Sequence, residues 1–174
     1  SIKIFKKELG YNPKFFSYPF GEYSTDFKKI IKDLKFKYAF GQHSGLIDTT
    51  KDEFELPRFP INEKYGDLKR FKFLLKLFPF PYKKIVPENK YINDAQNPPL
   101  VKIIFFENKK NIQKIKCYSN ENNEWQESEI KLNKNILKKI IKNKFISERG
   151  RINCSLLDKI GWRWLGIQFV VKNY

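Results

Sequence analysis

Methionine is absent from the 174 residues, and histidine occurs once, as His43. Average amino-acid usage would place several methionines in a chain of this length. Because the chain starts at Ser1, the absence fits either removal of an initiator methionine or a chain that begins partway through a longer protein. A single histidine excludes a zinc cluster of the Cys/His type built from this chain alone.

Cysteine is almost as scarce, since Cys117 and Cys154 are the two in the chain and no CxxC spacing occurs. The two positions are far apart in the sequence. They form one disulfide in an oxidising compartment or two buried thiols in a reducing one, and the sequence leaves both alternatives open.

Long hydrophobic runs are also missing. No apolar run approaches the roughly 20 residues that cross a bilayer, so we expect no membrane span. The start of the chain lacks the charged, apolar and small-residue order of a signal peptide, and cytoplasm and cell envelope both stay open. Hydrophobic residues still make up 41% and aromatic residues 17% of the chain, enough for a packed core.

Arginine is rare for so basic a chain. The net charge of +16 comes from 35 Lys and Arg against 19 Asp and Glu, yet only five of the basic residues are arginine. A high positive charge is typical of proteins that bind nucleic acid or acidic surfaces. Arginine, however, is the residue preferred for bidentate contacts to phosphates and bases. We therefore favour lysines spread over solvated faces, and nucleic acid is the less favoured partner.

The first 82 residues alternate short apolar strands with helical patterns, which is typical of βα units. Helices are expected over residues 2–9, from the cap Ser24 to Leu34, and from the cap Asp67 to about residue 78. Strands are expected over residues 15–20, 36–41 and 56–61. This part of the chain therefore predicts an α/β unit with parallel strands.

The pattern changes after residue 82. Residues 83–99 contain three prolines and lack helical periodicity, so we expect a linker. Short strands without long helices follow, at residues 100–107, 112–119, 129–132, 151–155 and 162–171, while residues 135–144 fit a helix or a basic loop. They predict an antiparallel β-sandwich over residues 100–174. Trp162 and Trp164 share one strand face, and we expect that face to line the core rather than an exposed carbohydrate platform.

Ligands of parallel α/β sheets collect at the carboxyl ends of the strands. Three such ends, at residues 18–23, 41–45 and 57–60, carry aromatic rings suited to stacking on sugars and polar groups suited to bonding hydroxyls. We expect sugar contacts from the side chains of Tyr18, Gln42, His43 and Arg58. Core packing for Tyr18 and a structural ion pair for Arg58 stay open as alternatives, and His43 is favoured as a loop histidine over a metal ligand.

The run FFSYPFGEYS at residues 15–24 resembles the third motif of polysaccharide deacetylases, the NodB homology domain, in the form found in poly-N-acetylglucosamine deacetylases. The runs GQHSG at residues 41–45 and LPRFP at residues 56–60 are similar to the closing strands of the same domain. RGRINCS at residues 149–155 and GWRW at residues 161–164 resemble an accessory β-domain of some bacterial members. The resemblance covers most of the chain.

The resemblance implies an α/β plus β fold: the carboxyl-terminal part of a distorted (β/α) barrel over residues 1–82, then a small antiparallel β-sandwich. It also implies a divalent metal, zinc or similar, that activates water to hydrolyse the N-acetyl groups of an amino-sugar polysaccharide. The family's metal ligands, one Asp and two His, come from an earlier half of the domain that this chain does not match. We therefore expect this chain alone to hold no metal and to be inactive.

By the same resemblance, the backbone N–H of Phe20, held between Pro19 and Gly21, is the donor to the oxyanion that forms during hydrolysis. A main-chain donor tolerates Phe in place of the family's usual Tyr. The arginine that many members carry shortly before the proline is not matched at Ser17. Two alternatives remain: a non-catalytic carbohydrate-binding or structural module and, less favoured, a basic nucleic-acid-binding protein.

Overall fold

A computed structural model describes residues 1–106 and 111–171 and shows mixed α/β content, with several sheets and few helices. The helices are α1 (Ile2–Leu9), α2 (Thr25–Asp33) and α3 (Leu68–Leu74), with short 3₁₀ turns η1 (Pro19–Gly21), η2 (Asp94–Gln96) and η3 (Ile112–Lys114). The strands are β1 (Phe15–Ser17), β2 (Tyr38–Phe40), β3 (Phe78–Pro79), β4 (Tyr82–Val86), β5 (Tyr91–Ile92), β6 (Val101–Phe105), β7 (Lys116–Glu121), β8 (Glu124–Glu127), β9 (Ile130–Asn133), β10 (Ile136–Lys139), β11 (Arg149–Asp158) and β12 (Gly161–Val171).

The amino-terminal part contains a βαβ unit. Strands β1 and β2 pair in parallel, and α2 connects them, starting where the Ser24 hydroxyl accepts a hydrogen bond from the Phe27 N–H at 3.1 Å. Leu56 joins β2 through a single parallel bridge to Phe40. The strand predicted over residues 56–61 is reduced to this bridge, because two prolines follow and lack the N–H that a ladder needs.

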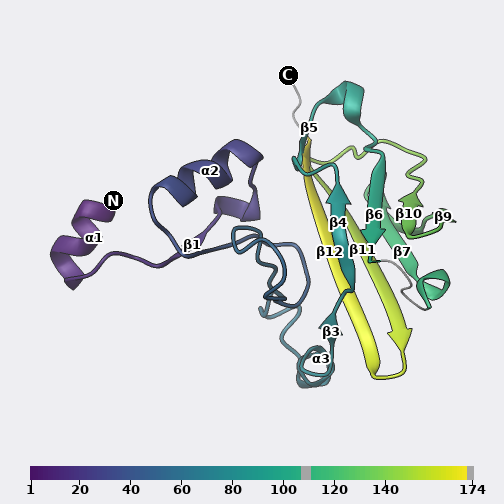
Figure 1. Ribbon diagram of the computed structural model, residues 1–174, viewed down its shortest axis with the longest axis horizontal. Coiled ribbons are helices and arrows are strands. Elements are labelled where there is room, and N and C mark those ends of the chain that lie inside the picture. Colours follow the sequence, from purple (N-terminus) through teal and green to yellow (C-terminus); the bar gives the residue numbers. More distant parts are fainter. Residues whose placement is uncertain (107–110, 172–174) are drawn as a thin grey trace.

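The expected first strand also ends early. It covers only Phe15–Ser17 because Pro19 starts the 3₁₀ turn η1. Within the described residues, β1 and β2 form a sheet of two strands, and no closed barrel is present. Figure 1 shows α1 extending away from the rest of the molecule, and none of its residues is buried.

Two further sheets form a sandwich around the main hydrophobic core (Figure 1). One has the order β4-β6-β10-β9, and the other has the order β3-β12-β11-β7-β8 with β5 also beside β12. Alternate residues of the central strand β11, Ile152, Cys154 and Leu156, point into the core against Val101 and Ile103 of β6. The outer face of the β11–β12 hairpin is therefore left for other contacts.

The linker prediction for residues 83–99 is wrong, since this segment contributes β4 and β5 to the two sheets. Its prolines lie outside both strands, so they do not interrupt the ladders. The stretch at residues 135–144 was expected to form a helix or a basic loop, but Ile136–Lys139 form strand β10, paired on its two sides by β6 and β9. No described helix is long and apolar enough to cross a membrane.

Cys117 and Cys154 lie opposite each other on β7 and β11 and are joined by a disulfide, which resolves the alternative left open by the sequence. The bond closes a loop with a sequence separation of 37 residues. We expect the double substitution Cys117→Ala/Cys154→Ala to lower the free energy of unfolding by about 3 kcal/mol, because the unfolded chain gains freedom. Urea denaturation checks this, and the wild-type protein with reductant should approach the variant. Equal stability of variant and oxidised wild type would contradict it.

Candidate functional site

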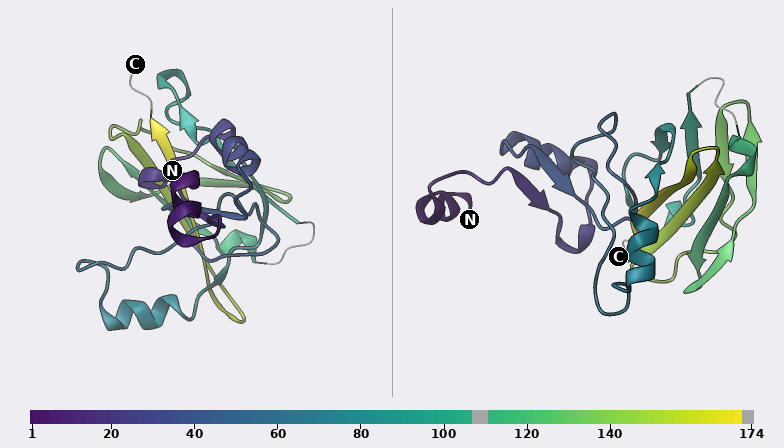
Figure 2. Two further views of the ribbon diagram at one scale, coloured as in Figure 1. Left: turned by 90° about the vertical axis from the view of Figure 1, so that its left-hand side faces the viewer. Right: turned by 90° about the horizontal axis from the view of Figure 1, so that it is seen from below.

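A groove of about 980 Å³ lies where the amino-terminal part meets the outer face of the β11–β12 hairpin. Its walls come from residues 42–44 and 58–62 and from α3, and its floor comes from β11 and β12. Figure 2 shows the βαβ unit on this side of the sandwich, so segments more than 100 residues apart in sequence build one site.

Ser44 fixes the loop that follows β2 onto the sheet. Its hydroxyl donates to Oδ1 of Asn153 at 3.0 Å and accepts from Nε1 of Trp164 at 2.8 Å. The next residue, Gly45, bridges to Leu165 on β12. Gly166 permits this approach, because a Cβ there would lie 2.4 Å from the Ser44 carbonyl oxygen. The loop therefore packs against β12 in one closely fitting position.

The turn η1 is held beside this loop. Phe20 has a left-handed backbone with φ 53°, its carbonyl accepts from Nε2 of Gln168 at 3.4 Å, and the guanidinium of Arg149 lies 5.2 Å from the centre of its ring. Arg149 also forms an ion pair with Glu22 at 2.6 Å. On the other side, a Cβ on Gly21 would lie 2.3 Å from the Gln42 nitrogen. The sandwich and the loop after β2 together position the turn.

Three of the residues expected to contact sugar line the groove: Gln42, His43 and Arg58. Tyr18 does not, and this expectation is corrected. Its side chain is 1% exposed, its hydroxyl donates to the Phe54 carbonyl at 3.1 Å, and its ring packs against Tyr23. Burial raises the pKa of Tyr18, so the hydroxyl stays protonated. Tyr18 belongs to the small core between α2 and the strands.

His43 is a neutral side chain at physiological pH. Burial is the main cause that lowers its pKa to about 4, with a smaller contribution from the positive charge of Lys90. Its Nδ1 is buried and has no hydrogen-bond partner within the described part of the chain. The centre of the His43 ring lies 6.1 Å from the centre of the Tyr23 ring. The neutral imidazole of His43 carries no charge, but its unprotonated ring nitrogen can accept a hydrogen bond at the groove wall.

The low pKa of His43 predicts a loss of stability in acid. Unfolded histidine titrates near its ordinary pKa of 6.5, whereas the folded side chain takes up its proton only near 4. The unfolded state therefore binds more protons as pH falls through this interval. We expect about 2 kcal/mol of stability to be lost from this residue between pH 7 and pH 5.

Urea denaturation of wild type and His43→Gln at both pH values isolates this effect, because the nearby Glu55 and Lys90 are common to the two proteins. The difference in unfolding free energy between wild type and variant should shift by about 2 kcal/mol in favour of the variant at pH 5. A difference that does not change with pH would contradict the prediction.

The floor of the groove was missed by sequence reasoning. It includes Arg151 and Asn153 of β11 and Trp164 and Gln168 of β12, with Trp125 of β8 nearby. The alternation of these strands carries a signal, because apolar residues occupy the inner positions and these residues the outer ones. The sequence therefore shows that β11 and β12 have an apolar and a polar face, but it does not show which segment covers the polar face.

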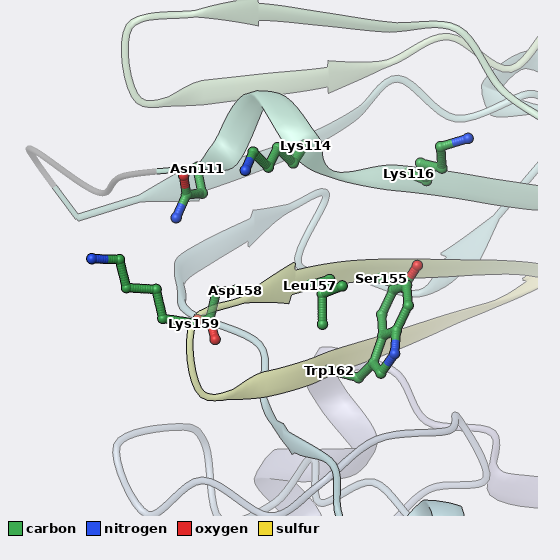
Figure 3. Close-up of a pocket in the computed structure, with 8 residues that line it drawn as sticks. All are labelled: Asn111, Lys114, Lys116, Ser155, Leu157, Asp158, Lys159 and Trp162. Carbon is green, nitrogen blue, oxygen red and sulfur yellow. The ribbon is translucent and has the colours of Figure 1, made fainter.

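The expectation that Trp162 and Trp164 line the sandwich core is wrong. The inward positions of β12 are held by Leu165, Ile167 and Phe169, which places both tryptophans on the outer face. Trp164 lines the groove, and Trp162 is 43% exposed. Trp162 lies in a second hollow of about 470 Å³ at the end of the hairpin, where Figure 3 shows it near Leu157, with Lys114 above and Lys159 to the left at the turn.

The lining of the groove is rich in groups that can hold a ligand. Its described lining contains amides, aromatic rings and guanidinium groups but no aspartate or glutamate. Residues 1–106 and 111–171 contain no group of three His, Cys, Asp or Glu side chains placed to hold a metal ion. The described side chains therefore do not fit the metal site that the family resemblance implies.

Comparisons with known proteins assign the chain to no family. No family model matches the sequence, and no curated protein matches it. Among solved structures, the chain is similar to an endo-beta-1,4-mannanase from Thermotoga petrophila, with 14% sequence identity and a TM-score of 0.39. The match covers 99% of this chain and spans 41% of the length of that one. This likeness is too low to assign a function.

Proposed function

We propose that the chain is the carboxyl-terminal part of a polysaccharide deacetylase-like protein and that its groove binds an N-acetylated glycan. In the complete protein, the reaction is hydrolysis of N-acetyl groups on an amino-sugar polymer, which releases acetate and leaves a free amine. Residues 1–82 are the last segments of a distorted (β/α) barrel in this proposal. The sandwich is the floor of the glycan site.

One observation carries the proposal. Three parallel segments, β1, β2 and the bridge at Leu56, lie side by side in that order. Each is followed at its carboxyl end by a part of the family-like sequence: η1, the loop 41–45, and Arg58. Strand ends of a (β/α) barrel converge on the active site in this way. The groove is lined by the second and third of these ends, and η1 lies beside it, joined to its lining by the hydrogen bond from Gln168 to the Phe20 carbonyl.

The surface of the amino-terminal part also supports the proposal. Ile4 and Leu9 of α1 are 65% and 54% exposed, and Phe15 of β1 is 63% exposed. Within the described residues, β1 has a partner strand on one edge only. Additional strands and helices of a barrel would cover these apolar groups and that edge.

A second candidate is a glycan-binding module without catalysis. It is favoured by the lining of the groove, which has the aromatic and amide groups of a sugar site but no pair of carboxylates. The two candidates differ in what lies outside this chain. Both require the groove to bind an N-acetylated oligosaccharide.

The test is acetate release from chitohexaose by two proteins, the 174-residue chain and a version extended by the coding sequence upstream of Ser1. We expect the upstream sequence to contain an Asp-Asp pair and a His-x-x-x-His motif, and only the extended protein to release acetate. If the extension has the motifs but releases none, the catalytic proposal fails. If the 174-residue chain binds neither chitohexaose nor any other N-acetylated oligosaccharide by calorimetry, the glycan proposal fails in both forms.

The proposal also predicts unequal protection within this chain. The amides of α1 and β1 should exchange with solvent much faster than those of β11 and β12, because nothing buries α1 and one edge of β1 has no described partner. Hydrogen exchange followed by mass spectrometry on the monomer measures this. Equal or better protection of the amino-terminal part would show that it is a finished unit rather than part of a barrel.

A further inference from the structure

We infer that the groove selects an acidic glycan, one whose sugars carry carboxylate groups beside the N-acetyl groups. This inference rests on the proposed function, because it takes glycan binding as given and specifies the chemical class of the glycan. It comes from the positive charges that line the groove, from the absence of described carboxylates paired with them, and from the combination of arginine and amide side chains in the lining.

The positive charge of the groove is concentrated in arginine. Three of the five arginines of the chain line it: Arg58 from the loop after Leu56, Arg70 from α3 and Arg151 from β11. The other two arginines are paired with carboxylates elsewhere. The basic residues of the chain are mostly lysine, so the groove contains a larger share of the arginines than an even distribution would give.

These three guanidinium groups have no carboxylate partner among the described residues, and the described lining of the groove contains no acidic residue. Arg70 is held in place by the carbonyls of Pro60 and Tyr65, at 3.2 and 2.6 Å, while its guanidinium lies over the Tyr65 ring. An anionic ligand would neutralise this charge. Guanidinium groups bind carboxylates in a two-point geometry and more strongly than neutral acceptors.

The remaining lining favours a sugar chain over a nucleic acid. Amide side chains recur along the groove at Gln42, Asn153 and Gln168, and amides bond the hydroxyls of sugars. Single-stranded nucleic acid is typically held by several exposed aromatic platforms. The exposed rings of Tyr65, Phe73 and Trp125 in this groove would suit bases as well as sugars, so the preference for a sugar chain comes from the amide side chains. A glycan with alternating N-acetylhexosamine and uronate units matches both sets of groups.

The experiment measures binding to the 174-residue chain by calorimetry in low salt. The probes are a hyaluronan hexasaccharide, the same hexasaccharide with its carboxylates reduced to alcohols, chitohexaose, and an oligothymidylate of similar length. We expect the native hyaluronan hexasaccharide to bind about tenfold tighter than the reduced form, and this preference to shrink as salt is raised.

Variants locate the effect. Arg151→Gln should weaken binding of the native hexasaccharide about tenfold and change chitohexaose binding less than about twofold, because a charged hydrogen bond is lost only in the first case. Arg151 is exposed, so the variant should fold. The control is Lys138→Gln, which removes the same charge from an exposed position on β10, in the other sheet. It should leave both affinities unchanged.

The outcomes separate the two levels of the proposal. Equal binding of the native and reduced hexasaccharides, or tighter binding of chitohexaose, overturns the inference and leaves glycan binding intact. Failure of all the sugars to bind overturns the proposed function itself. Oligothymidylate that binds tighter than every sugar and is weakened by Arg151→Gln also overturns the inference and assigns the groove to nucleic acid.

Discussion

In the extended protein, Gly21→Val is expected to slow deacetylation by about 10² to 10³-fold, the cost of losing one oxyanion donor. Gly21 has a φ of 71°, and a side chain there would overlap the backbone nitrogen of Gln42. Because Ser44 and Gly45 fix the loop after β2 on the sheet, the turn η1 rather than this loop would shift, and it would carry the Phe20 amide with it. The rate of acetate release from chitohexaose measures the effect.

Two matched variants separate displacement from other causes. Gly10→Val also places a side chain at a positive φ, of 79°, but meets nothing within 4 Å, so it should leave turnover unchanged. Phe20→Tyr keeps the backbone, and the exposed ring has room for a hydroxyl, so it should be nearly fully active. A folded Gly21→Val protein with normal turnover would remove η1 from the oxyanion site.

Glu121→Ala is expected to lower the free energy of unfolding by about 3 to 5 kcal/mol, the usual cost of orphaning a buried charge. Glu121 is 2% exposed, and one of its oxygens accepts from the backbone nitrogens of Lys142 and Asn143 at 3.1 and 2.9 Å. Its other oxygen accepts from Ser119 at 2.5 Å, and Ser119 in turn accepts from the fully buried ammonium of Lys139 at 3.0 Å. Urea denaturation at pH 7 measures the loss.

The charge of Lys139 is the reason that this loss is large. Burial lowers the pKa of its ammonium to about 8, so Lys139 is still charged at pH 7 and depends on Glu121. The double variant Glu121→Ala/Lys139→Met should therefore be more stable than Glu121→Ala alone. Glu124→Ala, at an exposed position on β8, is the control and should change stability by less than about 0.5 kcal/mol. A small loss in Glu121→Ala, equal to that of the control, would contradict the prediction.

A local element could be predicted where the residues that stabilise it lie within the same short stretch of sequence. The helix after Ser24 begins as predicted because its cap and its apolar stripe are a few residues apart. The cap at Asp67 is likewise confirmed, since its carboxylate accepts from the Arg70 N–H at 2.9 Å. Strand β4 was missed because the prolines and polar residues around it hide a short strand whose partner, β6, follows later in the chain.

Only the part of the groove that lies at strand ends could be predicted, because the rest depends on contacts between segments far apart in the sequence. Gln42, His43 and Arg58 follow strand ends, and such positions can be recognised in the sequence. Gln168 bonds the distant Phe20, and Arg151 belongs to the site only because the fold brings residues 42–44 and 58–62 to the same groove. Spacing shows that Trp162 and Trp164 share a face, but only the packing of the two sheets decides which face is covered.

The position of β12 in the molecule sets an order of events during synthesis. This strand pairs with β3, β5 and β11 and receives the bridge from Gly45, yet it is made after all of them. On the ribosome, the loop 41–45 emerges well before Leu165 and Gly166, the residues of β12 on which it docks. More than 100 residues separate the loop from these residues, and while they are synthesised its apolar neighbours are exposed to chaperones and to premature association.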